Sequence, residues 1–415
     1  MIPQANRNCP RFTSKVEASQ GASTVGLAAR LKRTLSDRYL AGSARITAHR
    51  IGGRSGPRDF RRVVVVGPIA RQNGLASGAR LQHAALWRLG INTELIDAAP
   101  ALHNPLFRVA HQPGSAYVVH AGGPQSAILL ATVLPHAADA YRIAYWAWEL
   151  PDPPREWAGC ERHFDEIWTP SDFAKESLVQ LFDRPIHVVP HHTPARPMRQ
   201  RDMAKPFTVL AMADSRSSMS RKNPEGALLA FNATFGTSPE ARLLLKLNGR
   251  PTDLDAFENS FADLLREDNV ELIRDYLDDD AMAALYRRAD VLLSLHRAEG
   301  FGLPMLESMA TGVPVVATAW SGNMEFMTPY NSELVPCRLV PVQDRYGMYT
   351  DSLWAEPDLN AASRALRRLA DDHVHYDRLA AAAYERVVTA SPRFPFAVPD
   401  TNLIHQHVPG HDIAR

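Results

Sequence analysis

Apolar positions follow two different spacings along the chain after Arg62. Short runs of β-branched residues, such as Val63–Val66, are typical of buried strands. Longer stretches with apolar residues every three to four positions lie between these runs and predict helices. Strands that alternate with helices indicate parallel sheets built from βαβ units. The pattern therefore predicts an α/β protein.

The alternation occurs twice, on either side of a proline- and histidine-rich segment at 190–197. In the first series we expect strands at Val63–Val66, Thr93–Ile96, Ala116–Val119, Ile143–Trp146, Glu166–Thr169 and His187–Val189. Helices are expected between them at Ala79–Leu89, Gln125–Leu134 and Phe173–Phe182.

The second series predicts strands at Thr208–Met212, Arg242–Leu247, Asn269–Ile273, Val291–Leu295 and Val313–Ala317. Its helices are expected at Pro224–Phe235, Asp280–Arg288, Gly302–Ala310, Leu359–Ala370 and Val374–Val388. We therefore predict two Rossmann-like, doubly wound domains, one over 62–192 and one over 193–390, that face a central cleft. In such sheets ligands bind beyond the carboxyl ends of the strands. A basic tail at 1–61 and an irregular tail at 391–415 flank the two domains.

Positive charge is concentrated at the start of the chain. The first 62 residues carry 13 Lys/Arg and 3 Asp/Glu, whereas the remainder carries 33 and 42. Residues 25–40 combine apolar side chains at helical spacing with four cations. This head is therefore either a partly disordered tail or an amphipathic segment in peripheral contact with an anionic membrane.

The overall composition excludes several classes of protein. The formal net charge is +1, which gives no reason to expect a nucleic-acid partner. No apolar run reaches the roughly 18 residues of a membrane helix, and the first 20 residues lack the apolar core of a secretory signal. The three cysteines are too far apart for a disulfide framework or a zinc site. We therefore expect a cytoplasmic protein, with the inner membrane face as the alternative.

The most informative segment is 297–318, which follows an expected strand. Gly300 and Gly302 allow a sharp turn, and Pro304 suits the first turn of a helix. Such a helix directs its free N–H groups and its positive dipole end at the loop, where a phosphate could bind. Glu299 and Glu307 flank this turn, and carboxylates there could accept hydrogen bonds from pairs of hydroxyl groups. Residue chemistry alone leaves open a purely structural role for both glutamates.

This segment resembles the C-terminal signature of the retaining GT-B glycosyltransferases of glycosyltransferase family 4. The signature places two glutamates eight positions apart in E-G-F-G-L-P-x-L-E, as Glu299 and Glu307 are here. The resemblance implies that Glu299 contacts hydroxyls of a donor sugar and Glu307 the ribose of its nucleotide. It also implies that N–H groups of Phe301, Gly302 and Leu303 lie near the sugar and phosphates.

A basic loop at 214–224 follows the first strand of the second series. Arg216, Arg221 and Lys222 place three cations on it. A diphosphate gains negative charge as it leaves a sugar, and nearby cations stabilise that charge. Arg216 and Lys222 resemble the Arg and Lys of this loop in the family, and Arg221 stands beside them. A solvated basic loop is the alternative.

Two further loops match the family less closely. The family usually has G-G-x-x-E after the last strand of the second series, and here only Gly322 and Glu325 match because a serine replaces the first glycine. The resemblance implies that main-chain N–H groups of this loop lie by the phosphates, which makes Gly322 and Glu325 candidates for donor binding. After the first strand of the chain, Gly74 and Gly78 are candidates for a glycine-rich loop that approaches donor and acceptor. A structural strand-to-helix turn accounts for these two glycines equally well.

Two residues of the first series are candidates for the acceptor side. His120 ends a strand, where an imidazole could donate a hydrogen bond to a sugar hydroxyl or remain a purely structural group. Glu149 lies in Y-W-A-W-E-L-P, a string that resembles a bacterial subset of the family linked to surface polysaccharides. Four of the seven tryptophans lie between positions 146 and 168, either as cleft wall or as core.

These features predict a retaining hexosyltransferase that uses a nucleoside-diphosphate sugar, with mannose and glucose both open. The resemblance implies Glu299, His120 and Lys222 in catalysis, no metal ion, no bound cofactor, and a glycan or lipid-linked acceptor in polysaccharide biosynthesis. We interpret the acidic run 278–280 as the start of a helix rather than a metal site. The alternatives are a GT-B nucleotide-sugar epimerase or hydrolase, and a non-catalytic scaffold that binds nucleotide sugars.

Overall fold

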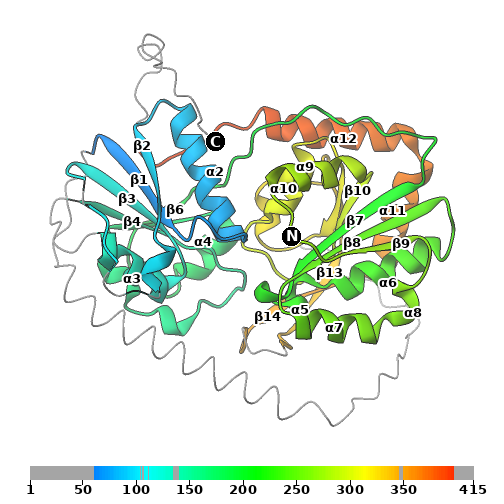
Figure 1. Cartoon of the computed structure of the whole chain (residues 1–415), viewed down its shortest axis with the longest axis horizontal. Coiled ribbons are helices and arrows are strands. Elements are labelled where there is room, and N and C mark those ends of the chain that lie inside the picture. The colour runs from blue at the N-terminus through cyan, green and yellow to red at the C-terminus, as the bar shows by residue number, and fades with distance from the viewer. Residues whose placement is uncertain are drawn as a thin grey trace, which may run out of the picture.

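The computed structural model describes residues 60–102, 104, 107–110, 112–133, 140–344 and 349–396. The expectations for most of the basic tail, for the stretch 25–40 and for the end of the second tail fall outside these residues. In the described part of the chain, two sheets lie beside one another, each surrounded by helices (Figure 1). No helix in that part is long and apolar enough to cross a membrane.

The first sheet has six parallel strands in the order β2-β1-β3-β4-β5-β6. The strands are β1 (Arg62–Gly67), β2 (Thr93–Asp97), β3 (Ser115–His120), β4 (Tyr141–Tyr145), β5 (Glu166–Thr169) and β6 (Ile186–Val188). The helices of this half are α2 (Gly74–Arg88), α3 (Gly123–Val133) and α4 (Asp172–Leu178), with 3-10 turns at Ala99–Leu102, Arg155–Trp157 and Cys160–His163.

The second sheet is also parallel, in the order β12-β11-β10-β7-β8-β9. Its strands are β7 (Phe207–Asp214), β8 (Ala241–Asn248), β9 (Val270–Ile273), β10 (Val291–Ser294), β11 (Val315–Thr318) and β12 (Glu333–Val335). Its helices are α5 (Met219–Lys222), α6 (Pro224–Phe235), α7 (Pro251–Ser260), α8 (Ala262–Leu265), α9 (Asp279–Arg288), α10 (Leu303–Met309), α11 (Leu359–Asp371) and α12 (His373–Val388), with 3-10 turns at Ser215–Ser217 and Gly322–Glu325.

An antiparallel hairpin that the sequence did not predict follows the second sheet. It pairs β13 (Cys337–Pro341) with β14 (Leu353–Pro357). The segment between these strands reaches the first half of the molecule, where the Ser352 hydroxyl donates a hydrogen bond to Asp152 at 2.6 Å. The hairpin therefore contributes to the contact between the two halves.

Both sheets are covered on both faces, which explains the apolar runs of their strands. All four valines of Val63–Val66 are fully buried, with alternate members packed into clusters on opposite faces of the first sheet. In the second sheet one face packs against α6 and α11, and the other against α9 and α10. The sequence prediction of two α/β units is confirmed by this arrangement.

The first helix begins earlier than the sequence predicts. Asn73 caps α2 by accepting a hydrogen bond from the amide of Ala76 at 3.0 Å. Gly74 and Gly78 therefore lie in the first turns of α2, so the alternative of a structural strand-to-helix turn, and not a glycine-rich loop, describes their local structure. The acidic run behaves as expected, since Asp278 caps α9 through the amide of Ala281 at 2.8 Å.

The chain crosses between the halves twice. It first crosses between β6 and β7, and after α12 it returns to the first sheet (Figure 1). On its return, Phe394 and Phe396 pack against Trp168 of β5, with ring centroids 5.7 and 5.9 Å away. The second tail is therefore held against the first half as far as it is described.

Candidate active site

A cavity of about 1080 Å³ lies between the two halves and is lined by residues from both. Its walls come from loops at the carboxyl ends of β1, β3, β4, β7, β8 and β10, as expected for parallel α/β sheets. Eleven of the predicted site residues line it: Gly74, His120, Glu149, Arg216, Arg221, Lys222, Glu299, Phe301, Gly302, Leu303 and Glu307. The predicted cleft is thus present, and most candidates meet in it.

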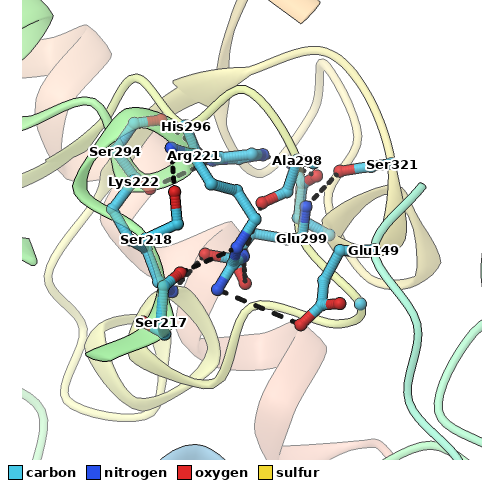
Figure 2. A network of polar contacts seen from close by, with 12 residues as sticks. Glu149, Ser217, Ser218, Arg221, Lys222, Ser294, His296, Ala298, Glu299 and Ser321 are labelled. Carbon is cyan, nitrogen blue, oxygen red and sulfur yellow. Dashed lines mark hydrogen bonds and ion pairs between the residues drawn. The ribbon is translucent and has the colours of Figure 1, made fainter. Parts of the chain in front are cut away.

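Four charged side chains form a network at the centre of the cavity (Figure 2). Glu299 is the hub: its carboxylate forms an ion pair with Lys222 and another with the Arg221 guanidinium at 3.2 Å. The other side of Arg221 faces Glu149 at 4.0 Å. Glu149 belongs to the first half and the other three to the second, so this network crosses the cavity.

The electrostatics keep Glu299 ionised. Burial alone would raise the pKa of Glu299, but the charges of Lys222 and Arg221 outweigh burial and lower it to about 2. Burial lowers the pKa of Lys222, and the charge of Glu299 opposes that effect. Burial also raises the pKa of Glu149, which Arg221 offsets only in part. The formal charges of the carboxylates Glu149 and Glu299 therefore balance those of the cations Arg221 and Lys222 before any substrate enters the cavity.

Arg221 differs from the other two cations of the basic loop. Its side chain is only 4% exposed, and it donates hydrogen bonds to the carbonyls of Ala298 at 2.7 Å and Ser217 at 3.1 Å. Together with its carboxylate partners, these contacts occupy the guanidinium. The sequence placed Arg221 beside the Arg216–Lys222 pair as a third cation for the diphosphate, but burial assigns Arg221 to holding the loops together.

Arg216 and Lys222 are more accessible than Arg221. Arg216 is exposed, pairs with Asp214 at 2.6 Å and lies over the ring of Tyr276 at 5.1 Å. Lys222 is half-buried and has Glu299 as its ion-pair partner. These two cations therefore remain the candidates for contact with a diphosphate.

The loop before α10 has the conformation that the glycines predict. Gly302 has a φ of +99°, which favours glycine. Within the described residues, the N–H groups of Phe301, Gly302 and Leu303 have no hydrogen-bond partner. These amides are therefore available to an anion in the cavity, as the resemblance implied.

The turn after β11 has a backbone conformation that favours glycine, although a serine stands where the family usually has one. Ser321 adopts a φ of +79°, and its hydroxyl accepts a hydrogen bond from the amide of Glu299 at 2.9 Å. Gly322 lies behind the loop, where its N–H donates to the carbonyl of Glu299 at 2.8 Å. That N–H group is therefore already used, so the expectation that Gly322 binds phosphate is corrected: Gly322 supports the loop.

Two other candidates also lie outside the lining of the cavity. Glu325 accepts a hydrogen bond from the amide of Asp172 at 2.9 Å, so it caps α4 of the opposite half instead of facing the donor. A Cβ at Gly78 would lie 2.5 Å from the ring of His191, so this glycine makes room for that ring. Glu325 and Gly78 thus contribute to the packing of the site rather than to its surface.

Glu307 lies on α10 and borders the same cavity. Its carboxylate accepts a hydrogen bond from the Tyr286 hydroxyl at 2.9 Å. Burial raises the pKa of Glu307, and the hydrogen bond from Tyr286 opposes that effect. Tyr286 on α9 therefore holds this carboxylate in place, a role that the sequence gave no reason to assign.

His120 borders the cavity from the end of β3 but is itself fully buried. Its ring stacks on Tyr145 with centroids 4.2 Å apart, and its Nε2 bonds to Gln82. Burial lowers the pKa of His120 well below its ordinary value, so the imidazole is neutral near pH 7. His120 is therefore a neutral, buried side chain in the wall of the cavity.

His191, from the segment that joins the two halves, also lines the cavity. Burial lowers its pKa to about 3, and its ring meets Phe301 edge-on with centroids 5.2 Å apart. Tyr349 and Lys246 are further lining residues that the sequence missed. Lys246 could have been found, because it lies near the carboxyl end of β8. Tyr349 lies beyond β13, where no pattern predicted contact with the cavity.

Within the described residues, no group of three or more His, Cys, Asp or Glu side chains is arranged to hold a metal ion. The charged groups Glu149, Arg221, Lys222 and Glu299 are instead paired with one another. The expectation of a metal-independent site stays a prediction.

The second half of the chain, which contributes to this cavity, is similar in sequence to known proteins. Residues 215–386 match the family described as "Glycosyl transferases group 1". The mannosyltransferase LpsB of lipopolysaccharide core biosynthesis from Rhizobium meliloti is 36% identical over 109 residues, 26% of each chain. D-inositol 3-phosphate glycosyltransferase from Corynebacterium glutamicum is 30% identical over 104 residues, 24% of this chain and 25% of the relative. These alignments span about a quarter of the relatives' length.

Solved structures show the likeness of the whole fold. Sucrose-phosphate synthase from Thermosynechococcus elongatus superposes with a TM-score of 0.60 and 16% identity, over 80% of this chain and 95% of that one. Anabaena HepE in complex with UDP and glucose superposes with a TM-score of 0.57 and 13% identity, over 80% and 96%. The chain therefore has the GT-B fold that the sequence predicted.

Proposed function

We propose that this chain is a retaining glycosyltransferase that moves a hexose from a nucleoside-diphosphate sugar to an acceptor hydroxyl. The observation that carries the proposal is the cavity, where the Glu299–Lys222 pair and the unpartnered amides of Phe301–Leu303 face the same space. Carboxylates suit sugar hydroxyls, whereas cations and amides suit a diphosphate.

The departing diphosphate is stabilised by positive charge and by N–H groups. Lys222 and Arg216 supply the charge, and the amides before α10 supply the hydrogen bonds. Such groups act where negative charge grows as the bond to the sugar breaks. Arg221 stays between Glu149 and Glu299, so each carboxylate keeps a cationic neighbour when Lys222 turns to phosphate.

The glutamates orient the donor. Glu299 accepts hydrogen bonds from hydroxyls of the hexose, and Glu307, held by Tyr286, accepts them from the ribose. The pKa of Glu299 near 2 keeps it an acceptor at neutral pH. Arg221, which stays paired with Glu299, disfavours attack of this carboxylate on the sugar, which is consistent with a polarising role and with a front-face mechanism.

The first half forms the acceptor side. His120 and Glu149 lie across the cavity from the basic loop, and with Gly74 they shape the space that an acceptor would enter. Because the aligned relatives include a mannosyltransferase and the superposed structures include one with UDP and glucose, mannose and glucose donors are the first to test. As acceptor we propose a glycan or a lipid-linked oligosaccharide in polysaccharide assembly, and the likeness to LpsB, a mannosyltransferase of lipopolysaccharide core biosynthesis, supports this choice.

The test is a donor screen. The protein is incubated with UDP-glucose or GDP-mannose and a mixture of lipid-linked acceptors, and the released nucleotide is measured. We expect release that depends on acceptor and falls at least a hundredfold in Lys222→Ala, the typical loss when a stabilising group of the transition state is removed. The matched control is Lys205→Ala, because Lys205 is exposed and pairs only with nearby Asp202.

Two results would contradict the proposal. Nucleotide release that yields free or altered sugar without acceptor would indicate a hydrolase or an epimerase. If calorimetry detected no binding of any donor at millimolar concentration, the transferase and the hydrolase or epimerase would both be ruled out. The cavity would then not bind the nucleotide sugar assigned to it.

A further inference from the structure

The start of α4, in the first half, contacts the loop before α10 in the second half. The Ser171 hydroxyl donates a hydrogen bond to the carbonyl of Gly300 at 2.7 Å. The next residue, Asp172, donates its amide to Glu325 at 2.9 Å. Pro170, just before them, lines the cavity. The start of α4 therefore lies where the two halves meet, beside the proposed donor site.

The Ser171 hydroxyl is held between two backbone groups. Ser171 is the N-cap of α4, and its Oγ accepts a hydrogen bond from the amide of Ala174 at 3.2 Å. A hydroxyl has one proton to donate and two lone pairs that accept. Because the amide of Ala174 uses a lone pair, the proton is free to point at the Gly300 carbonyl. Ser171 is 1% exposed, so bulk water has little access to either contact.

The peptide that joins Gly300 to Phe301 depends on this contact. Among the described residues, Ser171 supplies the one hydrogen bond to the Gly300 carbonyl, and the Phe301 N–H has no partner. The carbonyls before and after it, of Glu299 and Gly302, instead accept hydrogen bonds from amides of the second half itself. The second half thus holds the neighbouring peptides, whereas the first half holds this one.

The direction of the Phe301 N–H follows from that of the Gly300 carbonyl. A trans peptide is planar and carries its C=O and N–H on opposite sides, so a bond that fixes the carbonyl also fixes the N–H. Gly300 has no Cβ to restrict rotation of the peptide. A donor to the carbonyl also strengthens the N–H as a donor, because successive hydrogen bonds polarise one another. Ser171 therefore directs and strengthens one of the amides assigned to the diphosphate.

We propose that Ser171 is a positioning residue for the donor diphosphate: from the first half, it orients the Gly300–Phe301 peptide of the second half so that the Phe301 N–H meets the anion. The proposal rests on the function proposed above. The amides before α10 are then complete as an anion site only where the two halves meet. Without the hydroxyl, the Gly300 carbonyl loses its donor, and the Phe301 N–H becomes a weaker and less directed one.

The test compares Ser171→Ala with the wild type by calorimetry. UDP and GDP are the probes that carry a diphosphate, and uridine and guanosine are the matching probes without one. We expect the Kd of the bound diphosphate to rise about three- to tenfold, the scale for one hydrogen bond, while the Kd of the matching nucleoside stays within about twofold. Acceptor-dependent kcat/KM falls by at least the same factor, because the charge on the diphosphate grows in the transition state. Ser171→Thr keeps a hydroxyl and restores both values.

Controls are needed because Ser171→Ala also removes the N-cap of α4. Asp358→Ala removes the N-cap of α11, where the carboxylate accepts from the amide of Ala361 at 3.0 Å, and Asp358 does not line the cavity. This control should lower the midpoint of thermal unfolding and leave every Kd and kcat/KM unchanged. Ser171→Gly removes the same hydroxyl at a smaller cost to the N-cap, so it replaces Ser171→Ala if the alanine variant does not fold.

Two outcomes would overturn the role of Ser171. One is a diphosphate Kd that stays at the wild-type value without the hydroxyl, and the other is an equal rise in the Kd of diphosphate and nucleoside, which would indicate a general loss of packing. If the diphosphate Kd rises as expected but the wild type transfers no sugar, only the proposed function fails. If the wild type transfers sugar and Ser171→Ala binds and transfers equally well, only the role of Ser171 fails.

Discussion

The support that Gly322 gives to the loop before α10 leads to a quantitative prediction. Gly322 donates its N–H to the carbonyl of Glu299 at 2.8 Å and packs directly behind Gly300 and Phe301. In Gly322→Ala the added Cβ would overlap the carbonyl of Gly300 and lie 2.6 Å from the amide nitrogen of Phe301. Backbone atoms cannot rotate away as a side chain would, so the loop itself must move.

The size of that movement sets the expected effect. Ordinary contact with a Cβ begins near 3.4 Å, so the amide of Phe301 must retreat by roughly 1 Å. A displacement of about 1 Å in a positioning group can cost about a hundredfold in rate. Overpacking of this kind also costs about 1–3 kcal/mol of stability. We therefore expect a folded protein with kcat/KM reduced about a hundredfold.

The assay is acceptor-dependent nucleotide release together with thermal unfolding. Gly114→Ala is the control, because alanine at this φ of +70° strains the backbone, whereas Gly114 has open space around it and lies away from the cavity. It should lose stability and keep its kcat/KM. If Gly322→Ala kept kcat/KM within about threefold of the wild type, the idea that this glycine sets the position of the loop would be refuted.

Three further predictions concern single contacts of the site. Tyr286→Phe removes the donor to Glu307 and should raise the donor KM about three- to tenfold with little change in kcat; an unchanged KM would argue against the ribose contact. Gly78→Ala should displace the ring of His191, which lies 2.5 Å from the added Cβ, and lower stability by about 1–3 kcal/mol, as unfolding by heat would show. The pKa of Glu299 is lowered in the folded state from 4.5 to about 2, so its ionisation stabilises the fold above pH 4.5 by about 3 kcal/mol. The wild type should therefore have a higher free energy of unfolding than Glu299→Gln near neutral pH, and acid unfolding should show this difference disappear as the pH falls from about 4.5 to 2. A difference in the free energy of unfolding that does not depend on pH would contradict the prediction.

Much of the fold was predictable because it depends on local patterns. The buried strand Val63–Val66 is uniformly β-branched, and α6 begins and ends where Asn223, Pro224 and Gly236 predict a cap, a first turn and an end. The hairpin of β13 and β14 was missed because β13 has no buried residue and neither strand has a strong apolar pattern. Its position depends on contacts with the opposite half of the molecule.

The candidate site was predictable to the extent that one continuous segment carries it. Glu299, Phe301, Gly302 and Glu307 all come from the stretch after β10, and all line the cavity. Glu325 misled us because its place in the motif says nothing about the opposite half, whose α4 it caps. Sequence spacing is informative only while the residues share one loop or helix.

The amino-acid sequence by itself determined which segments become strands and helices, and that a glycine turn with flanking glutamates would follow β10. Only the tertiary structure decided which charges meet: that Arg221 is buried between Glu149 and Glu299, and that Tyr349 reaches the same place. The physical reason is the distance along the chain over which each effect acts. Backbone preference and hydrophobic periodicity act over a few residues, whereas burial and ion pairing depend on surfaces that become neighbours only when the two sheets pack.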